Sequence, residues 1–196
     1  FKWNIDANIS FNRNAIGGLA SDRFAERLWY NADNIFIQRN GMPIGSMFGY
    51  VEDGFYDNEA EVRADQVYAN ASNAVVRSKL GEIKYRDLNG DGQITASDRT
   101  IIGNTNPDFV FGLTNNFKYR DFTLGFFWQG SIGNDIFNGN LIDMKMANLG
   151  NITQDIYKSR WTEENHENAL WPKDVATYNR TMQTSDRYVE KGSNVR

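Results

Sequence analysis

The first twelve residues alternate strictly between apolar and polar side chains. A period of two predicts a β-strand, because successive side chains of a strand point to opposite faces. The apolar face carries Trp3, Ile5, Ala7, Ile9 and Phe11, and the polar face carries Lys2, Asn4, Asp6, Asn8, Ser10 and Asn12. The length of this segment is close to the roughly 9–11 residues of a strand that crosses a bilayer. An apolar and a polar face also fit the outer sheet of a soluble sandwich.

A stronger pattern occupies residues 109–129 and predicts a β-hairpin. Two alternating arms meet at Arg120-Asp121, which we interpret as a two-residue turn. The antiparallel pairs that follow are Tyr119 with Phe122, Phe117 with Leu124, and Leu113 with Trp128. In this register the apolar faces of both arms coincide, apart from one polar interruption at Asn115. A shift by one residue would separate the two faces, so the alternation and the turn length support the same register.

The aromatic residues of this hairpin gather at its two ends. Tyr119 and Phe122 lie beside the turn, whereas Trp128, Phe109 and Phe111 lie toward the other end. Two aromatic belts that flank an apolar band are typical of strands in a membrane-spanning β-barrel. In a soluble sandwich the same rings would form the core, so the hairpin alone leaves both folds open.

Long polar connections separate the predicted strands. One short helix is predicted around Ala60 to Tyr68, and residues 133–186 form a very long loop. Within this loop, Asn151 and Gln154 have the spacing of an N-cap and the third residue of a helix, which predicts a short helix ending near Trp161. Compact soluble domains seldom carry such loops. Short turns at one end of the strands and long loops at the other are typical of outer-membrane barrels.

Composition narrows the possible functions. The chain has 21 basic and 25 acidic residues, and the net charge of −4 provides no electrostatic footprint for nucleic acid. Cysteine is absent, which excludes disulfides and thiolate zinc sites, and the single histidine, His166, lies in a polar run typical of a solvated loop. No serine nucleophile elbow, phosphate-binding glycine loop or glycosidase carboxylate pair is recognisable, so we expect no enzyme.

Residues 87–98 have the spacing of an EF-hand calcium loop. Oxygen ligands fall at the first, third and fifth positions, Gly92 provides a sharp turn at the sixth, and a backbone carbonyl follows at the seventh. An aspartate takes the twelfth position in place of the usual glutamate. The candidate ligands are Asp87, Asn89, Asp91, Gln93 and Asp98. We expect a structural Ca2+ ion here, with Mg2+ left open, against the alternative of a solvated tight turn.

Several segments, in order along most of the chain, resemble the C-terminal barrel region of the SusC/RagA family of TonB-linked transporters. They are Gly41 to Tyr50 with Asp53-Gly54-Phe55, Gly81 to Arg86 before the 87–98 loop, Arg99 to Asn104 with Pro107-Asp108-Phe109, Gln129 to Asn138, Arg160-Trp161-Thr162, and Val189 to Ser193. The resemblance implies an all-β fold class: several antiparallel strands of a large transmembrane β-barrel, with long extracellular loops that contain short helices.

The resemblance also implies a function for the whole protein. Residues 1–196 would be part of a TonB-dependent receptor barrel of about 22 strands, without its plug or TonB box. Such a transporter imports oligosaccharides or peptides across the bacterial outer membrane, lies in the lipid bilayer, contacts TonB through other parts, and has a SusD-like surface lipoprotein as a lid. The Arg120-Asp121 turn would face the periplasm, the long loops would face the extracellular side, and Val189 to Arg196 would open a further strand. The calcium ion would stiffen an outer loop, one without a core of its own, against which the lid closes.

Two alternatives come from other classes of protein. A soluble, calcium-stabilised β-sandwich, such as a carbohydrate-binding or adhesion module, would use the aromatic rings as a core or as sugar contacts. A dockerin-like module is disfavoured, because dockerins use two calcium loops and this chain has one. The burial of Phe117, Leu124 and Trp128 distinguishes the barrel from the sandwich, because only a sandwich packs these side chains inside a closed domain.

Overall fold

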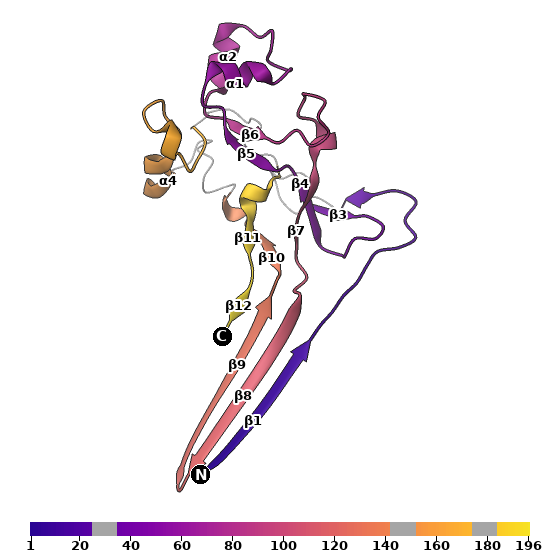
Figure 1. Cartoon of the computed structure of the whole chain (residues 1–196), viewed down its shortest axis with the longest axis vertical. Coiled ribbons are helices and arrows are strands. Elements are labelled where there is room, and N and C mark those ends of the chain that lie inside the picture. Colours follow the sequence, from indigo (N-terminus) through magenta and orange to yellow (C-terminus); the bar gives the residue numbers. More distant parts are fainter. Residues whose placement is uncertain (25–34, 142–151, 174–183) are drawn as a thin grey trace.

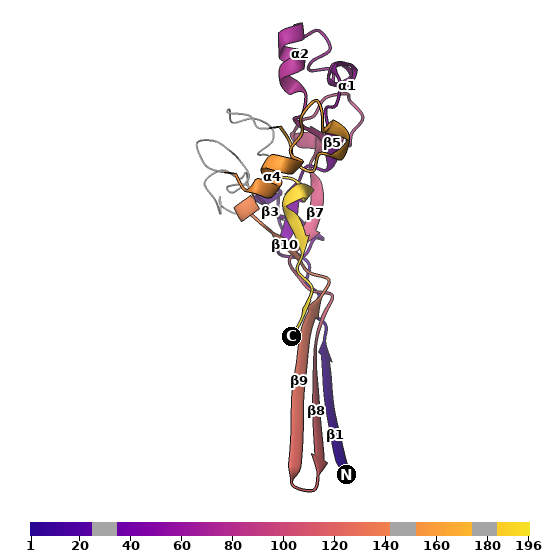
Figure 2. The ribbon, with the colours of Figure 1, turned by 90° about the vertical axis from the view of Figure 1, so that its left-hand side faces the viewer.

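The computed structural model describes residues 1–24, 35–141, 152–173 and 184–196. The molecule is elongated, with a narrow sheet of long strands at one end and a head of short strands and helices at the other (Figure 1). The N-terminus lies at the far tip of the sheet beside the hairpin turn, and the C-terminus lies close to where the sheet meets the head (Figure 2).

The narrow sheet, which we call the long sheet, has four antiparallel strands in the order β1-β8-β9-β12. The strands are β1 (Lys2–Ser10), β8 (Phe109–Tyr119), β9 (Phe122–Ile132) and β12 (Asn194–Val195). Tyr119 pairs with Phe122, Phe117 with Leu124 and Leu113 with Trp128, so the predicted hairpin register is confirmed. Arg120 adopts a φ of 54°, alone among the non-glycine residues that the structure describes. This left-handed conformation suits a tight hairpin turn.

The head contains three smaller antiparallel sheets. A four-stranded sheet has the order β2-β3-β4-β7, and two-stranded sheets pair β5 with β6 and β10 with β11. The strands are β2 (Arg23–Phe24), β3 (Phe36–Gln38), β4 (Ser46–Gly49), β5 (Glu52–Phe55), β6 (Ile83–Tyr85), β7 (Thr100–Asn104), β10 (Asp135–Phe137) and β11 (Val189–Lys191). The strand predicted at Val189 to Arg196 is thus present as two short strands, β11 and β12, with a break between them. β11 pairs with β10 in the head, and β12 pairs with β9 in the sheet of long strands.

The helices of the head are short. Those of the described residues are α1 (Glu59–Ala64), α2 (Asn73–Lys79) and α4 (Gln154–Ser159), with 3-10 turns η1 (Ala96–Asp98), η2 (His166–Asn168) and η4 (Asp186–Tyr188). No helix among the described residues has the length and apolar content needed to cross a membrane.

The helix predictions need three corrections. The helix predicted around Ala60 to Tyr68 is α1, which ends at Ala64, and a second helix, α2, was not predicted. The helix before Trp161 begins at Gln154, with Thr153 as its N-cap; Asn151 lies outside the described residues. Within the described part of residues 133–186, the polypeptide forms β10, α4 and η2 and is therefore not one irregular loop.

The hydrophobic core lies entirely in the head, as far as the chain is described. Three clusters contain most of its buried side chains: Ile35, Met47 and Tyr188; Tyr50, Phe55, Ile83, Tyr85 and Trp161; and Tyr56, Val62, Tyr68 and Val76. The head therefore has a hydrophobic core of its own. Side chains far apart in sequence, such as Tyr50 and Trp161, supply it, and the local pattern gives no sign of their meeting.

The long sheet contributes none of the buried hydrophobic side chains of the described chain. Leu124 is 63% exposed and Trp128 is 53% exposed, and Phe117 is only partly buried. A soluble sandwich would place these side chains in a core. Their exposure instead matches a sheet that presents its apolar face to surroundings outside the chain, as a membrane barrel does.

Candidate functional site: a two-faced sheet below a polar head

The apolar face of the long sheet carries an aromatic row that crosses three strands. Trp3 of β1 stacks on Phe117 of β8 at 5.5 Å between ring centroids, Phe117 stacks on Phe126 of β9 at 5.8 Å, and Phe126 lies 6.1 Å from Trp128. The row exists because the predicted register places the apolar positions of β1, β8 and β9 side by side. An apolar area of this extent on one face identifies a surface that must be covered.

Asn115, the single polar position on the apolar face, is only 6% exposed. The indole Nε1–H of Trp3 donates a hydrogen bond to Asn115 Oδ1 at 3.2 Å. Trp3 therefore pairs the amide oxygen and covers it, so that Asn115 does not present an unsatisfied acceptor to an apolar environment.

The opposite face of the long sheet is polar. Amide, hydroxyl and charged side chains line it on β1 and β8, in phase with the alternation. Val110 of β8 and Phe127 of β9 are the exceptions, and they are 41% and 53% exposed on this face. An apolar outer face and a polar inner face are what a barrel needs when one side meets lipid and the other side meets water.

The 87–98 loop holds its candidate ligands by hydrogen bonds to its own backbone. Asp87 Oδ1 accepts from the Gly90 N–H and Asp87 Oδ2 from the Gly92 N–H, both at 2.7 Å. Asn89 Oδ1 accepts from the Asp91 N–H at 2.8 Å, and Asp91 Oδ1 accepts from the Gln93 N–H at 2.8 Å. These turns give the loop a defined shape, with Asp87, Asn89 and Asp91 on one short stretch of chain.

Asp98, at the twelfth position, is buried and used differently. Its Oδ1 accepts from the N–H groups of Leu88 and Asn89, and its Oδ2 accepts from the Thr95 N–H at 2.7 Å as part of a capping box on η1. Burial would raise the pKa of Asp98, but hydrogen bonds from Thr95, Asn89 and Leu88 outweigh it and hold the pKa below its usual value. Asp98 therefore closes the loop by hydrogen bonds.

Within the described residues, no group of three or more acidic or histidine side chains is close enough together to hold a metal ion. The Asn89 amide and the Gln93 backbone carbonyl are neither acidic nor histidine groups, so they do not count toward such a group. The calcium site therefore stays a prediction. The remaining expected ligands are close in sequence but not gathered around one point.

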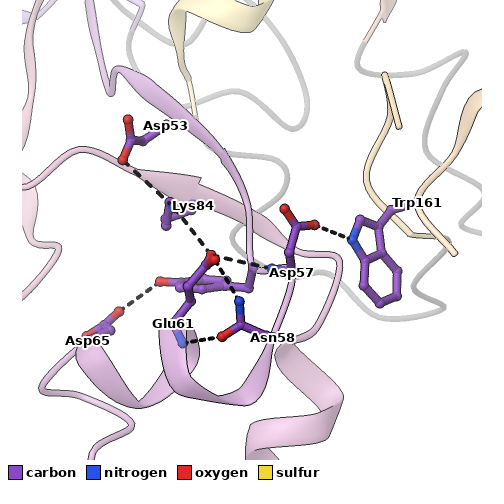
Figure 3. Close-up of polar contacts among 8 residues, drawn as sticks. Asp53, Asp57, Asn58, Glu61, Asp65, Lys84 and Trp161 are labelled. Carbon is purple, nitrogen blue, oxygen red and sulfur yellow. Dashed lines mark hydrogen bonds and ion pairs between the residues drawn. The ribbon is translucent and has the colours of Figure 1, made fainter. Parts of the chain in front are cut away.

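A polar cluster fastens α1 to the rest of the head (Figure 3). Lys84 of β6 lies 3.4 Å from Glu61 of α1 and 4.0 Å from Asp53 of β5. Asn58 caps α1, because its Oδ1 accepts from the Glu61 N–H at 2.9 Å and its Nδ2 donates to Glu61 Oε1 at 2.8 Å. The Lys84 ion pairs are part-exposed and weak singly, so the cluster positions α1 more than it stabilises the head.

A second contact in the same view joins the 154–173 segment to Asp57, which lies just before the N-cap of α1. The Trp161 Nε1–H donates to Asp57 Oδ1 at 2.7 Å, and the Trp161 ring is buried in the core (Figure 3). Arg187 makes a third connection: it donates to the Leu170 carbonyl, forms an ion pair with Glu52, and lies over the rings of Phe55 and Trp171. No local pattern in the sequence indicates Arg187, because its partners are up to 135 positions away.

Comparison with known proteins identifies related receptors, although no family model matches the chain. It is 31% identical to "TonB-dependent receptor P3" of Formosa agariphila, over all of the chain and 19% of that protein. It is 26% identical to "TonB-dependent receptor P26" of the same organism, again over all of the chain and 19% of the relative. It is 28% identical to "TonB-dependent receptor SusC" of Bacteroides thetaiotaomicron, over 70% of the chain and 12% of that protein. The chain thus spans about a fifth or less of the length of these receptors.

Solved structures share the fold. The "Structure of the RagAB peptide transporter" matches 99% of the chain and 20% of its own chain, with a TM-score of 0.68 and 17% identity. The "RagAB peptide importer in the 'closed-closed' state" matches 98% of the chain with a TM-score of 0.62. The predicted fold class, antiparallel strands of a large β-barrel with helix-containing loops, is confirmed by this likeness. The prediction that the chain is not an enzyme is also confirmed, because its relatives are receptors. With a TonB-dependent receptor 31% identical over the whole chain, and with SusC among its relatives, the chain belongs to the TonB-dependent receptors of the SusC/RagA type.

Proposed function

We propose that this chain is a section of barrel wall, with its outer head, in an outer-membrane transporter that imports oligosaccharides or peptides. The observation that carries the proposal is the two-faced long sheet, with an aromatic row on one side and polar side chains on the other. The aromatic face would contact lipid and the polar face would line the lumen. The head would lie on the extracellular side, and the Arg120-Asp121 turn would lie in the periplasm.

The partners follow from the family. A SusD-like surface lipoprotein would close over the extracellular side, and TonB would act through parts of the transporter outside residues 1–196. The packed core of the head and its polar connections support this role, because a lid needs a surface of fixed shape to close against.

Uptake by intact cells tests the proposed function. Deletion of the gene for the whole transporter should abolish growth on either a peptide mixture or an oligosaccharide mixture as the limiting nutrient, and the wild-type gene should restore it. Disruption of the host's TonB should give the same loss. Growth on every nutrient mixture, unchanged by the deletion, would contradict import as the function.

We also propose that the 87–98 loop takes a structural calcium ion. The EF-hand spacing supports this, as does the positive φ of Gly92 (78°), which bends the chain where the sixth residue of a calcium loop bends. Asp87, Asn89, Asp91 and the Gln93 carbonyl would be the ligands. Asp98 would join only by giving up hydrogen bonds, because its two oxygens already accept three from backbone N–H groups and one from the Thr95 hydroxyl.

Terbium luminescence, excited through tryptophan and tyrosine, tests the calcium site on the whole transporter. The double variant Asp87→Ala/Asp91→Ala should lose one calcium-displaceable terbium site, because it removes two of the charged ligands. Glu163→Ala with Glu164→Ala, in an exposed turn, is the matched control and should keep it. If the ion stiffens the surface under the lid, the first pair should also lower lid affinity and uptake; equal terbium binding by both pairs would remove the site.

A further inference from the structure

An amide-rich pocket is lined by residues that follow β1 and precede β8. These segments lie where the long sheet meets the head (Figure 1). Its volume is about 290 Å3, near the lower limit of small-molecule sites at roughly 300 Å3. A pocket of this size holds part of a larger ligand. We call it the junction pocket; Asn12, Arg13, Asn14, Pro43, Asn104, Asn106, Pro107 and Asp108 line it.

The junction pocket continues the polar face of the sheet. Asn12 and Asn14 follow the even-numbered polar positions of β1, and Asn106 and Asp108 precede those of β8 in the same phase. Asp108 still pairs with β9, because its N–H donates to the Ile132 carbonyl at 2.8 Å. A ligand that passes along the polar face would therefore meet this pocket at the head end of the sheet.

One wall of the junction pocket is fixed by hydrogen bonds among its asparagines. Asn14 Nδ2 donates to Asn106 Oδ1 at 3.3 Å, and Asn106 Nδ2 donates to Asn104 Oδ1 at 2.8 Å. Ile44 closes this network, because its N–H donates to Asn14 Oδ1 at 2.8 Å and its carbonyl accepts from Asn106. Pro43 and Pro107 restrict the backbone on either side. A wall ordered in advance costs less entropy when a ligand binds.

The charged groups of the junction pocket, by contrast, have no partner in the described structure. Neither the Arg13 guanidinium nor the Asp108 carboxylate makes a hydrogen bond or an ion pair there, and the two do not pair with each other. The Asp108 carboxylate is held against Gly133, where an added Cβ would lie 2.2 Å from Asp108 Oδ2. The pocket thus presents a cation and an anion that do not pair with each other, together with amide side chains.

We propose that the junction pocket binds one end of an imported peptide. Arg13 receives the C-terminal carboxylate through two parallel N–H bonds, which its planar fork favours. Asn12 and Asn104 contact peptide amides, and Asp108 accepts from a backbone N–H. No aromatic side chain lines the pocket, so the apolar face of a sugar ring has nothing to stack on. The inference rests on the proposed import function and specifies its substrate class.

Peptide retention by the purified whole transporter tests this inference. The probes are an equimolar mixture of tetrapeptides with free termini and the same mixture amidated at the C-terminus, with retained peptides measured by mass spectrometry. The wild type should retain the free-carboxylate mixture about tenfold more than the amidated one, because a charge-assisted pair is lost on amidation. Arg13→Gln should remove that preference, and Asp108→Asn should lower retention of both mixtures about tenfold.

Lys158→Gln and Glu164→Gln are the matched controls, because they make the same charge changes on exposed side chains of the head away from the pocket. Both should leave retention unchanged. The inference is overturned if the wild type retains neither mixture, retains both equally, or keeps its preference in Arg13→Gln. It is also overturned if maltotetraose, but no peptide, is retained in a manner sensitive to Arg13 and Asp108. Loss of the pocket effect with wild-type uptake intact would contradict this inference alone; absence of uptake would contradict the proposed function.

Discussion

Leu113 and Thr114 are neighbours in the middle of β8, and their side chains lie on opposite faces of the long sheet. Both residues are partly buried. Leu113 lies opposite Trp128 on the apolar face, whereas Thr114 lies opposite Phe127 and Asp6 on the polar face. If lipid covers the apolar face, Leu113→Arg places a cation near the centre of the hydrocarbon.

The magnitude follows from that position. Arginine facing lipid at the bilayer midplane costs about 2–4 kcal/mol, and the cost falls to about 0–1 kcal/mol near the interfaces. Thr114→Arg should cost less than about 0.5 kcal/mol, as expected of a substitution on a solvated surface, with Asp6 opposite as a countercharge. The free energy of unfolding, measured by denaturant titration of the whole transporter in phospholipid vesicles, should therefore be lower for Leu113→Arg than for Thr114→Arg by roughly 1.5–4 kcal/mol.

Equal destabilisation by the two substitutions, or a larger effect of Thr114→Arg, would refute the assignment of the faces. A loss of cooperative unfolding would make the free energies incomparable. The fraction of each variant that migrates as a folded barrel in unheated gels of outer membranes then provides the comparison, with the same expected order.

Three further predictions concern single contacts. Trp3→Phe leaves Asn115 Oδ1 without its hydrogen-bond donor and should lower the free energy of unfolding by about 1 kcal/mol. Adding Asn115→Leu should recover most of that loss. Additive effects in this double-mutant cycle would show that the hydrogen bond at 3.2 Å contributes nothing. Arg120→Asn should stabilise the hairpin by a few tenths to about 1 kcal/mol in the same denaturant titration, because asparagine tolerates the positive φ better; no change would mean that the turn relaxes without cost. Because the pKa of Asp98 lies below its unfolded value of about 3.9, its hydrogen bonds stabilise the loop above that pH and are lost as the pH falls through the lower folded value. Hydrogen exchange at the Leu88 and Thr95 amides should therefore be slow at neutral pH and fast in Asp98→Asn, and equal rates in both proteins would contradict the role of the carboxylate.

The hairpin was predictable to the residue, and the head was not. In the hairpin, two alternating arms and a two-residue turn restrict the register, because a shift by one residue turns every ring to the wrong face. The N-cap of α1 shows how far local signals reach in the head: Asn58 and Glu61 are three residues apart, yet the extent of the helix was overestimated and α2 was missed. Helices this short depend on packing more than on their own sequence.

The junction pocket shows the same division at the level of a site. Arg13 and Asp108 are 95 positions apart, each in an ordinary polar segment, and nothing local connects them. The segments that resemble the SusC/RagA family include Pro107-Asp108-Phe109 but not residues 12–14. The pocket could therefore be found only after β1 and β8 were paired.

The sequence by itself determined the two faces of the long sheet, the register of its hairpin and the spacing of the 87–98 loop. All three depend on residues that are near one another in the chain, where periodicity and turn length express the geometry directly. Only the tertiary structure decided that the head has its own core, that Arg187 connects three of its segments, and that Asp98 is enclosed by backbone amides. Those features arise from side chains brought together by the closure of long connections, and local sequence does not specify which distant partner each side chain meets.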